Sequence, residues 1–217
     1  LVPIWYSTDG EVMIKSKPYD VVLLPADYIS EQAIKHSKMI SQNFATYFTL
    51  DGKTRYPHAT LYQIEIYDNN LEFFKKHLSK IFLSQKEIST DLLGFSNYDT
   101  FVFWDVQKTK AFYKLHQSVV EKLNFLRDGL KVSVVLSAFD DFSDSQKNEL
   151  EQYGAIGIAE NFHPHITITR LKNSSDVKSA LVLLNQREKE VTFNKVALGL
   201  LSDHGTVIDI IEEFYLK

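Results

Sequence analysis

The sequence predicts an α+β fold with mostly antiparallel sheet. Segments with helical periodicity alternate with segments of strand character, and short turns typical of hairpins join some of the strands. The chain has only 8 glycines, and none of them forms the glycine-rich phosphate loop that marks many parallel nucleotide-binding sheets. A length of 217 residues, of which 44% are hydrophobic and 24% charged, fits a single globular domain over residues 1–217.

In the first half of the chain, two helices are expected between four strands. Ser30 can cap the first helix and Asn70 the second, because such side chains accept hydrogen bonds from the free amides of a first helical turn. The apolar residues that follow each cap recur at helical spacing. Asn97-Tyr98-Asp99 separates two short strands and indicates a hairpin. The expected strands are Val21–Leu24, His58–Ile66, Thr90–Phe95 and Thr100–Val106.

The second half contains the most regular helix, which is expected to open at Thr109. Ser143 and Gln146 form the pattern of a capping box, and Gly154 provides a matching helix end. The stretch Val132–Leu136 fits either a strand or a buried helix. The remaining expected elements are a strand over Pro164–Arg170, a helix over Ser175–Leu184, and closing strands over Val191–Leu200 and Val207–Phe214.

Composition excludes several kinds of chemistry. The chain contains no cysteine, which removes disulfide scaffolds, zinc–thiolate sites, iron–sulfur clusters and cysteine nucleophiles. A net charge of −4 disfavours a long basic surface for nucleic acid, although a local basic pocket stays open. No apolar run approaches the roughly 18–20 residues of a membrane span. Leu1 to Tyr19 lacks the features of a signal peptide, and the leucine start indicates trimming or processing. The absence of cysteine is compatible with cytosol or export. We expect a cytoplasmic protein with no membrane partner.

One short pattern occurs twice. Pro57-His58-Ala59-Thr60-Leu61 and Pro164-His165-Ile166-Thr167-Ile168 both read proline, histidine, apolar, threonine, apolar. With 7 histidines and 12 threonines, chance places a threonine two positions after a histidine about 0.4 times in this chain (7 × 12/217). Each copy also begins an expected strand, where proline is tolerated at the first position. The repeated pattern is therefore a candidate functional motif.

Strand geometry predicts which motif side chains lie together. Successive side chains of a strand point to opposite faces, so residues two apart share a face. Each motif strand then presents an imidazole beside a hydroxyl, while the apolar residues between them anchor in the core. The sets expected to share a face are His58, Thr60 and Tyr62 in the first strand, and His165, Thr167 and Thr169 in the second.

Two such faces supply acid–base chemistry for a phosphate group. The unperturbed pKa of histidine is about 6.5, so an imidazole can take up or release a proton at neutral pH. A neutral imidazole can take a proton from an attacking water or hydroxyl while a protonated one donates to the leaving oxygen, and each contributes about 10²–10⁴-fold to the rate. Threonine hydroxyls can hold the non-bridging phosphate oxygens. This scheme needs no metal and no cofactor.

The two motifs resemble those of the 2H phosphoesterases, a family named for its pair of His-x-Thr-apolar motifs. That family includes 2′-5′ RNA ligase-like proteins and cyclic nucleotide phosphodiesterases. The resemblance covers roughly Tyr19 to Leu216, and Phe162 to Arg170 is similar to the family's second motif with its common arginine. It implies two similar α+β lobes around a central cleft, with one motif on each lobe. The implied roles are catalysis for His58 and His165 and phosphate binding for Thr60 and Thr167.

By the same resemblance, we expect hydrolysis of a 2′,3′-cyclic phosphate or a 2′-5′ phosphodiester in a nucleotide or short RNA. His165 is the expected general base and His58 the general acid, although the two roles could be exchanged. The stretch 126–161 is longer than compact members of the family need, which indicates a possible insertion beside the cleft. The alternative is a non-catalytic nucleotide- or RNA-binding module on the same fold. We expect a monomer that binds a short ligand rather than long nucleic acid.

Further residues carry weaker expectations. Arg170 could clamp a phosphate through its guanidinium, and Tyr62 could stack on a base because it shares the expected motif face. His163 could line the site or stand at the strand entrance, and a zinc site built from it lacks an acidic ligand in either motif. The histidines expected at helix surfaces are His36, His77 and His116.

Overall fold

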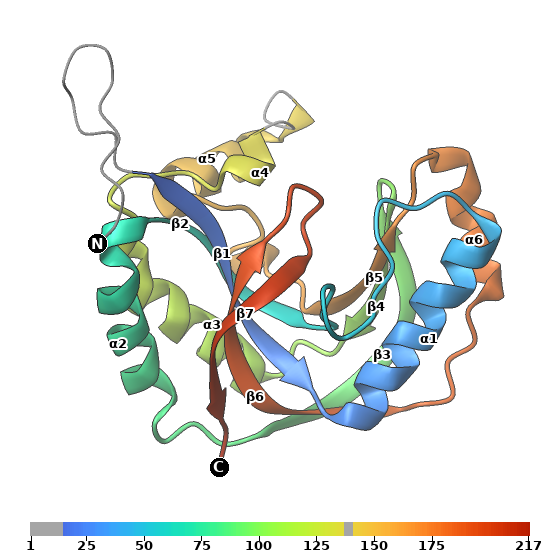
Figure 1. The fold of residues 1–217 in the computed structure, drawn as a ribbon, viewed down its shortest axis with the longest axis horizontal. Helices are drawn as coiled ribbons and strands as arrows, with labels where there is room; N and C mark the ends of the chain where they lie inside the picture. The colour runs from blue at the N-terminus through green and yellow to red at the C-terminus, as the bar shows by residue number, and fades with distance from the viewer. Residues whose placement is uncertain (1–14, 137–140) are drawn as a thin grey trace.

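A computed structural model describes residues 15–136 and 141–217 (Figure 1). Residues 1–14, which belong to the stretch without signal-peptide features, and residues 137–140, inside the expected insertion, lie outside the described residues. The strands are β1 (Ser16–Pro25), β2 (Ala59–Tyr67), β3 (Ile88–Tyr98), β4 (Phe101–Val106), β5 (His165–Arg170), β6 (Glu190–Leu201) and β7 (Val207–Tyr215). The helices are α1 (Asp27–Asn43), α2 (Leu71–Phe82), α3 (Lys110–Leu123), α4 (Ser133–Leu136), α5 (Asp144–Tyr153) and α6 (Val177–Leu183).

The described strands form one sheet in the order β1-β2-β5-β4-β3-β6-β7, with an additional pairing between β1 and β6. All of these pairings are antiparallel. The circuit of paired strands from β1 through β2, β5, β4, β3 and β6 therefore returns to β1. The predicted α+β class with antiparallel sheet is confirmed.

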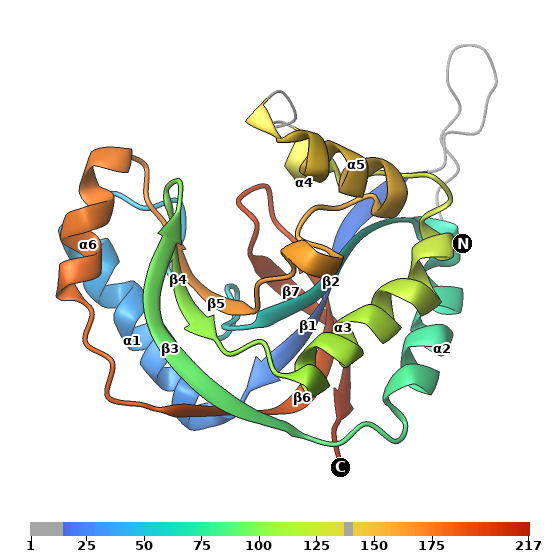
Figure 2. The same cartoon turned by 180° about the vertical axis from the view of Figure 1, so that it is seen from behind.

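The two motif strands meet where the circuit passes from β2 to β5. Their paired residues are Ala59 and Ile166. On one side of this junction α3 packs against β2, with α2 beside α3, and on the other side α1 packs against β5, with α6 beside α1 (Figure 2). Helices thus cover each motif strand from the outside, which leaves the opposite faces of β2 and β5 for the candidate site.

Local caps explain where several helices begin. Thr109 accepts a hydrogen bond from the amide of Phe112, as expected, and Ser143 with Gln146 forms the predicted capping box of α5. The predicted start at Ser30 is wrong, because α1 begins at Asp27 and the Ser30 hydroxyl donates to the carbonyl of Pro25. An acidic residue in the first turn suits the positive end of the helix dipole.

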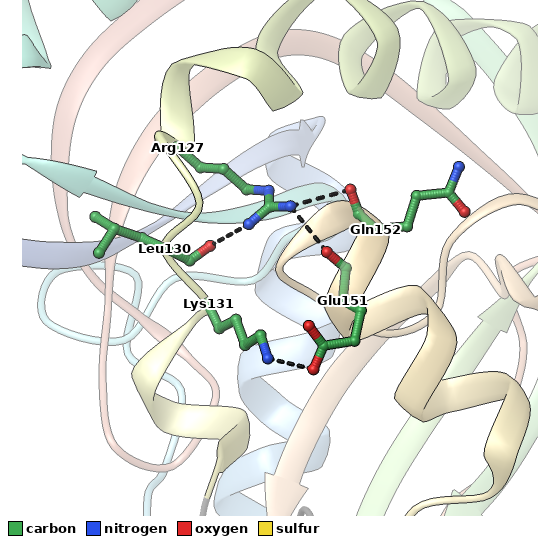
Figure 3. A network of polar contacts seen from close by, with 5 residues as sticks. All are labelled: Arg127, Leu130, Lys131, Glu151 and Gln152. Carbon is green, nitrogen blue, oxygen red and sulfur yellow. Dashed lines mark hydrogen bonds and ion pairs between the residues drawn. The ribbon is translucent and has the colours of Figure 1, made fainter.

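Arg127 links the beginning of the segment 124–153 to its end (Figure 3). The guanidinium of Arg127 donates to the carbonyl of Leu130 at 2.8 Å and to the carbonyls of Glu151 and Gln152 at 3.0 and 3.1 Å. Lys131 forms an ion pair with the carboxylate of Glu151. These contacts satisfy carbonyl groups at the end of α5 and hold the segment together behind β2.

The main hydrophobic core lies between the sheet and the helices. Val21, Leu61 and Ile166 belong to this core. A second, smaller cluster of Val22 with Val207 lies on the other face of β1, as the alternation of a strand requires. No helix within residues 15–136 and 141–217 has the length and apolar character to cross a membrane.

Candidate active site

The two motifs lie side by side because β2 and β5 pair near the start of each strand, through the residue at the centre of each motif. Ala59 and Ile166, the paired residues, each stand between the histidine and the threonine of a motif. In an antiparallel register, one step from this pair sets each histidine opposite the threonine of the other motif. Directly opposed side chains have Cβ atoms about 4.5–5.5 Å apart. The opposed pairs are His58 with Thr167 and Thr60 with His165.

A β-bulge comes directly after the threonine of the first motif. Thr60 pairs with Val22 of β1. The next pair joins Tyr62 to Val21, which leaves Leu61 as the extra residue. An extra residue turns every later side chain to the other face. The expectation that Tyr62 shares the face of Thr60 is therefore wrong.

Tyr62 instead serves the core on the helix side of the sheet. Its side chain is fully buried, and its hydroxyl donates to the carbonyl of Tyr153 at 2.6 Å and lies 3.0 Å from Oδ1 of Asn124. The hydrogen-bonding capacity of the hydroxyl is used by the segment behind β2. A base-stacking role for Tyr62 does not fit this placement.

The second motif strand has a bulge at the matching place. Thr167 pairs with Phe103 of β4. The next pair joins Thr169 to Val102, which leaves Ile168 as the extra residue. The expectation that Thr169 shares the face of Thr167 is therefore wrong, and Thr169 is fully buried.

The same bulge carries Arg170 onto the face of Thr167. The guanidinium lies over the ring of Phe101, with Cζ 4.6 Å from the ring centroid, and over Tyr47 at 5.2 Å. Such cation–π contacts hold the planar group against the rings. Phe101 could have been found from the sequence, because successive side chains of β4 point to opposite faces of the sheet. Phe101 and Phe103 therefore lie on the face opposite the buried Val102.

His58 is deeply buried, with 3% of its surface exposed. Its Nδ1 lies 2.6 Å from the carbonyl oxygen of Tyr56, so Nδ1 carries the ring proton and donates it. Burial lowers the pKa of His58 to about 4, and the hydrogen bond to Tyr56 opposes this change. At neutral pH the ring is therefore neutral, with its Nε2 lone pair available as a base.

His165 has the same arrangement on the second strand. Its Nδ1 donates to the carbonyl of His163 at 2.7 Å. Burial lowers the pKa of His165 to about 4, the hydrogen bond to the His163 carbonyl opposes this change, and electrostatic interactions with His163 and His58 reinforce it. The pairing of Ala59 with Ile166 places His58 on the neighbouring strand, which is consistent with its effect on His165. The ring of Phe103 packs on His165, with centroids 3.9 Å apart.

His163 stands at the entrance of the second strand. It is exposed, and its Nε2 lies 3.3 Å from Oδ1 of Asp105. Asp105 also accepts a hydrogen bond of 2.8 Å from the hydroxyl of Ser96. The ring of His163 lies 5.4 Å from that of His165, so its carbonyl and its ring both help to position His165.

Asp20 is the site residue that motif reading misses. It lies on β1, is fully buried, and its Oδ2 accepts a hydrogen bond of 2.7 Å from the hydroxyl of Thr60. Burial raises the pKa of Asp20 to about 7, while hydrogen bonds from Thr60 and Gln63 oppose this change. Its Oδ2 is 3.8 Å from Nε2 of His58, beyond hydrogen-bond distance. The sequence signal that points to Asp20 is an acidic residue next to the apolar run of β1.

Two helical histidines differ from the expectation of surface positions. His116 is 1% exposed and His36 is 5% exposed, whereas His77 is partly exposed at the helix surface, as expected. His36 packs edge-on against Trp104 and Phe95 in the core. Helical spacing places both residues on the apolar stripes of their helices, which outweighs the polarity of the ring. Among the described residues, no group of three or more His, Asp or Glu is arranged to hold a metal ion.

The fold and the paired motifs define a protein of the 2H phosphoesterase class. A family model described as the 2'-5' RNA ligase superfamily matches residues 32–206, a range that includes both motifs. The chain belongs to this family. A comparison with curated proteins gives no sequence match.

Solved structures share the fold at low sequence identity. TT0787 of Thermus thermophilus is 13% identical, with 92% of this chain and 97% of that chain covered, at a TM-score of 0.57. A structure described as a phosphoesterase is 11% identical, with 94% and 99% covered, at 0.55. Escherichia coli LigT complexed with ATP is 12% identical, with 94% and 99% covered, at 0.54. At these identities the likeness concerns the fold alone.

Proposed function

We propose that this protein is a metal-independent phosphoesterase that hydrolyses a 2′,3′-cyclic phosphate or a 2′-5′ phosphodiester in a nucleotide or short RNA. The observation that carries the proposal is the pairing of Ala59 with Ile166, which brings two histidines and two threonines together. Membership of the 2'-5' RNA ligase superfamily supports a phosphoesterase-type function. The proposal includes one domain with two similar lobes, and the matching bulges after Thr60 and Thr167 support that internal likeness.

The proposed reaction moves one proton at each histidine. Nε2 of His165 takes a proton from the attacking water while its oxygen forms a bond to phosphorus. The bond from phosphorus to the ribose oxygen breaks, and Nε2 of protonated His58 donates its proton to that leaving oxygen. Both rings are oriented for this step because each donates Nδ1–H to a backbone carbonyl and turns Nε2 to the substrate. Thr60, Thr167 and Arg170 are proposed to hold the phosphate oxygens.

The surroundings of the two rings support His58 as the acid. The carboxyl of Asp20 lies near His58, with 3.8 Å between Oδ2 and Nε2, and in its ionised form its negative charge favours an imidazolium. His165 has the apolar ring of Phe103 against it, and burial together with the electrostatic interaction with His163 lowers its pKa. These surroundings favour the neutral form that a general base requires.

A short ligand is proposed rather than a long strand. LigT, which shares the fold, has been solved in complexes with 3'-AMP and with ATP. In this chain, Arg170 with Phe101 and Tyr47 combines a cation with exposed or partly exposed rings, a combination suited to a phosphate and a base. A net charge of −4 gives little attraction for a long polyanion.

The second candidate is a binding module without turnover on the same fold. The low pKa of both imidazoles favours it, since a site that keeps both rings neutral lacks a proton donor until a ligand supplies negative charge. The two candidates differ in whether bound nucleotide is converted.

Turnover of 2′,3′-cyclic mononucleotides and of 2′-5′ and 3′-5′ dinucleotides tests the proposal, with ligand binding measured in parallel. The phosphoesterase assignment expects a monophosphate product that H58A and H165A fail to produce and that a metal chelator leaves unaffected. Binding of these nucleotides without any product identifies the protein as a binding module. Full activity in both single variants excludes the proposed site.

A further inference from the structure

Corresponding threonines of the two motifs are held differently. Thr60 donates its hydroxyl proton to Oδ2 of Asp20 at 2.7 Å. For Thr167, whose hydroxyl holds the matching place, no hydrogen-bond partner is found in the part of the chain that the structure describes. Asp20 pairs with Gln63, three residues after Thr60. The corresponding residue beside the second motif is Phe101, which pairs with Arg170, three residues after Thr167. The acid is therefore an asymmetric addition to a symmetric pair of motifs.

The hydrogen bond to Asp20 decides what Thr60 can offer to a ligand. A threonine hydroxyl has one proton to donate and two lone pairs to accept with. While Thr60 donates to an ionised Asp20, only its lone pairs face the site, and these repel a phosphate oxygen. When the carboxyl of Asp20 is protonated, that carboxyl can donate to Thr60 Oγ1, and the Thr60 proton is free to turn to the phosphate.

We propose that Asp20 is a positioning residue that aims the Thr60 hydroxyl at the bound oxyanion when its carboxyl is protonated and withdraws that hydroxyl when it is ionised. This inference deepens the proposed function and rests on the same site. The asymmetry between the motifs means that Thr60 responds to pH and Thr167 does not.

The packing around Asp20 makes both protonation states accessible. Its side chain is fully buried, and although Thr60 and Gln63 favour the ionised form, Oδ1 has no hydrogen-bond partner among the described residues, so burial of the ionised carboxylate is only partly compensated. Burial raises the pKa of Asp20 to about 7, which lies within the working range of most enzymes.

Few other charges act on this carboxyl. On β6, Gly199 pairs with Asp20, and Val207 of β7 packs against Gly199; neither residue titrates. His58 is the titratable side chain next to Asp20, and His58 in turn lowers the pKa of His165 on β5. A measured effect of Asp20 must therefore be separated from the titration of His58.

Sulfate binding between pH 5.5 and 8.5 tests the proposal, because sulfate keeps its double negative charge over this range. Wild-type affinity is expected to fall about tenfold as the pH rises through 7, the effect of losing one hydrogen bond to a charged group. D20N is expected to bind sulfate tightly at every pH, since its carboxamide donates permanently to Thr60. T60V is expected to bind sulfate weakly, with an affinity that does not change with pH. T60S is expected to restore both the tighter binding and its decrease with rising pH. The matched control T167V is expected to bind sulfate weakly but to keep the decrease with rising pH.

Three results overturn the proposal. A fall of unchanged size in D20N means that another group titrates, and a fall that persists in T60V means that Asp20 acts by its charge and not through Thr60. Failure of wild-type protein to bind sulfate at pH 6 contradicts the claim that two threonine hydroxyls are then free. If D20N does not fold, the pH dependence of sulfate affinity is compared between T60S and T60V, and the same dependence in both variants contradicts the proposal.

Turnover of a 2′,3′-cyclic mononucleotide by the same variants separates this inference from the proposed function. The expected sulfate pattern without any turnover supports the role of Asp20 and contradicts the phosphoesterase assignment. Turnover by a wild-type protein whose sulfate affinity does not change with pH supports the phosphoesterase assignment and contradicts the role of Asp20.

Discussion

The Nδ1–H of His116, on α3, donates a hydrogen bond of 2.7 Å to the carbonyl of Leu61, the extra residue of the bulge after Thr60. Nε2 of the same ring accepts from the amide of Ala159 at 3.2 Å, which fixes Nδ1 as the donor. The ring is stacked on Phe162 with centroids 3.9 Å apart. One buried histidine thus holds the bulge that ends the first motif.

Replacing His116 with phenylalanine is expected to destabilise the protein by about 1–3 kcal/mol, because the Leu61 carbonyl and the Ala159 amide lose their buried partner. Catalytic efficiency is expected to fall as well, since the bulge sets the direction of Thr60. Urea unfolding and kcat/KM measure the two effects. H77F is the matched control on the neighbouring helix, where the partly exposed ring hydrogen-bonds to the carbonyl of Phe73 in its own helix. Equal stability of H116F and H77F would show that the bulge does not depend on His116.

Loss of either proposed catalytic imidazole is expected to lower kcat by about 10²–10⁴-fold. H58A and H165A should each reach this range, and the double variant should lose little more, because the two groups act in one step. H163A is the control from the same strand entrance and should keep activity within about tenfold, since its carbonyl, which holds His165, remains. A deficit in H163A as large as that of H165A would make His163 a member of the reacting set.

Acid is expected to destabilise the protein through the two site histidines. Both have a folded-state pKa of about 4, whereas an unfolded imidazole titrates near 6.5. Between these values the unfolded chain binds more protons, so the free energy of unfolding falls as the pH falls from about 6.5 to 4. The slope of unfolding free energy against pH, measured by urea unfolding, should be smaller in H165N than in the wild type. H77N, which changes a partly exposed ring outside the site, should keep the wild-type slope.

Asp20 is expected to have the opposite effect on the pH dependence of stability. The pKa of Asp20 is raised to about 7 in the folded protein, so the folded state holds a proton that the unfolded chain releases above about pH 4. Stability from this group therefore falls as the pH rises from 4 to 7. D20N should remove that loss and be more stable than the wild type at pH 8. A D20N variant that is less stable at pH 8 would mean that the ionised carboxylate is well supported.

Tyr62 and Arg170 are expected to separate stability from binding. Y62F should lose about 1–2 kcal/mol of stability, because its hydroxyl is hydrogen-bonded under the sheet, and should leave KM unchanged. R170A should leave stability nearly unchanged, since the side chain lies over Phe101 and Tyr47 at the edge of the site, and should raise KM. Chemical unfolding and steady-state kinetics on both variants check this. The reverse pattern would place Tyr62, not Arg170, at the ligand.

Much of the fold could be predicted because it depends on local signals. The helix start at Thr109 was predicted from apolar periodicity, and the cap at Ser143 from side chains that satisfy free amides nearby. The start at Ser30 was missed, since an equally good first turn exists three residues earlier at Asp27. The short α4 could not be decided from Val132–Leu136, because a short apolar run fits a strand and a helix alike.

The sequence by itself determined that a histidine and a threonine stand together on each of two strands, because alternation needs no knowledge of neighbours. Only the tertiary structure decided where the side chains beyond each threonine point. A bulge is defined by the partner strand, so the register of β1 and β4 turned Tyr62 and Thr169 into the core and brought Arg170 to the site. Burial also belongs to the folded state, since the packing of other segments around Asp20 sets its pKa and its hold on Thr60.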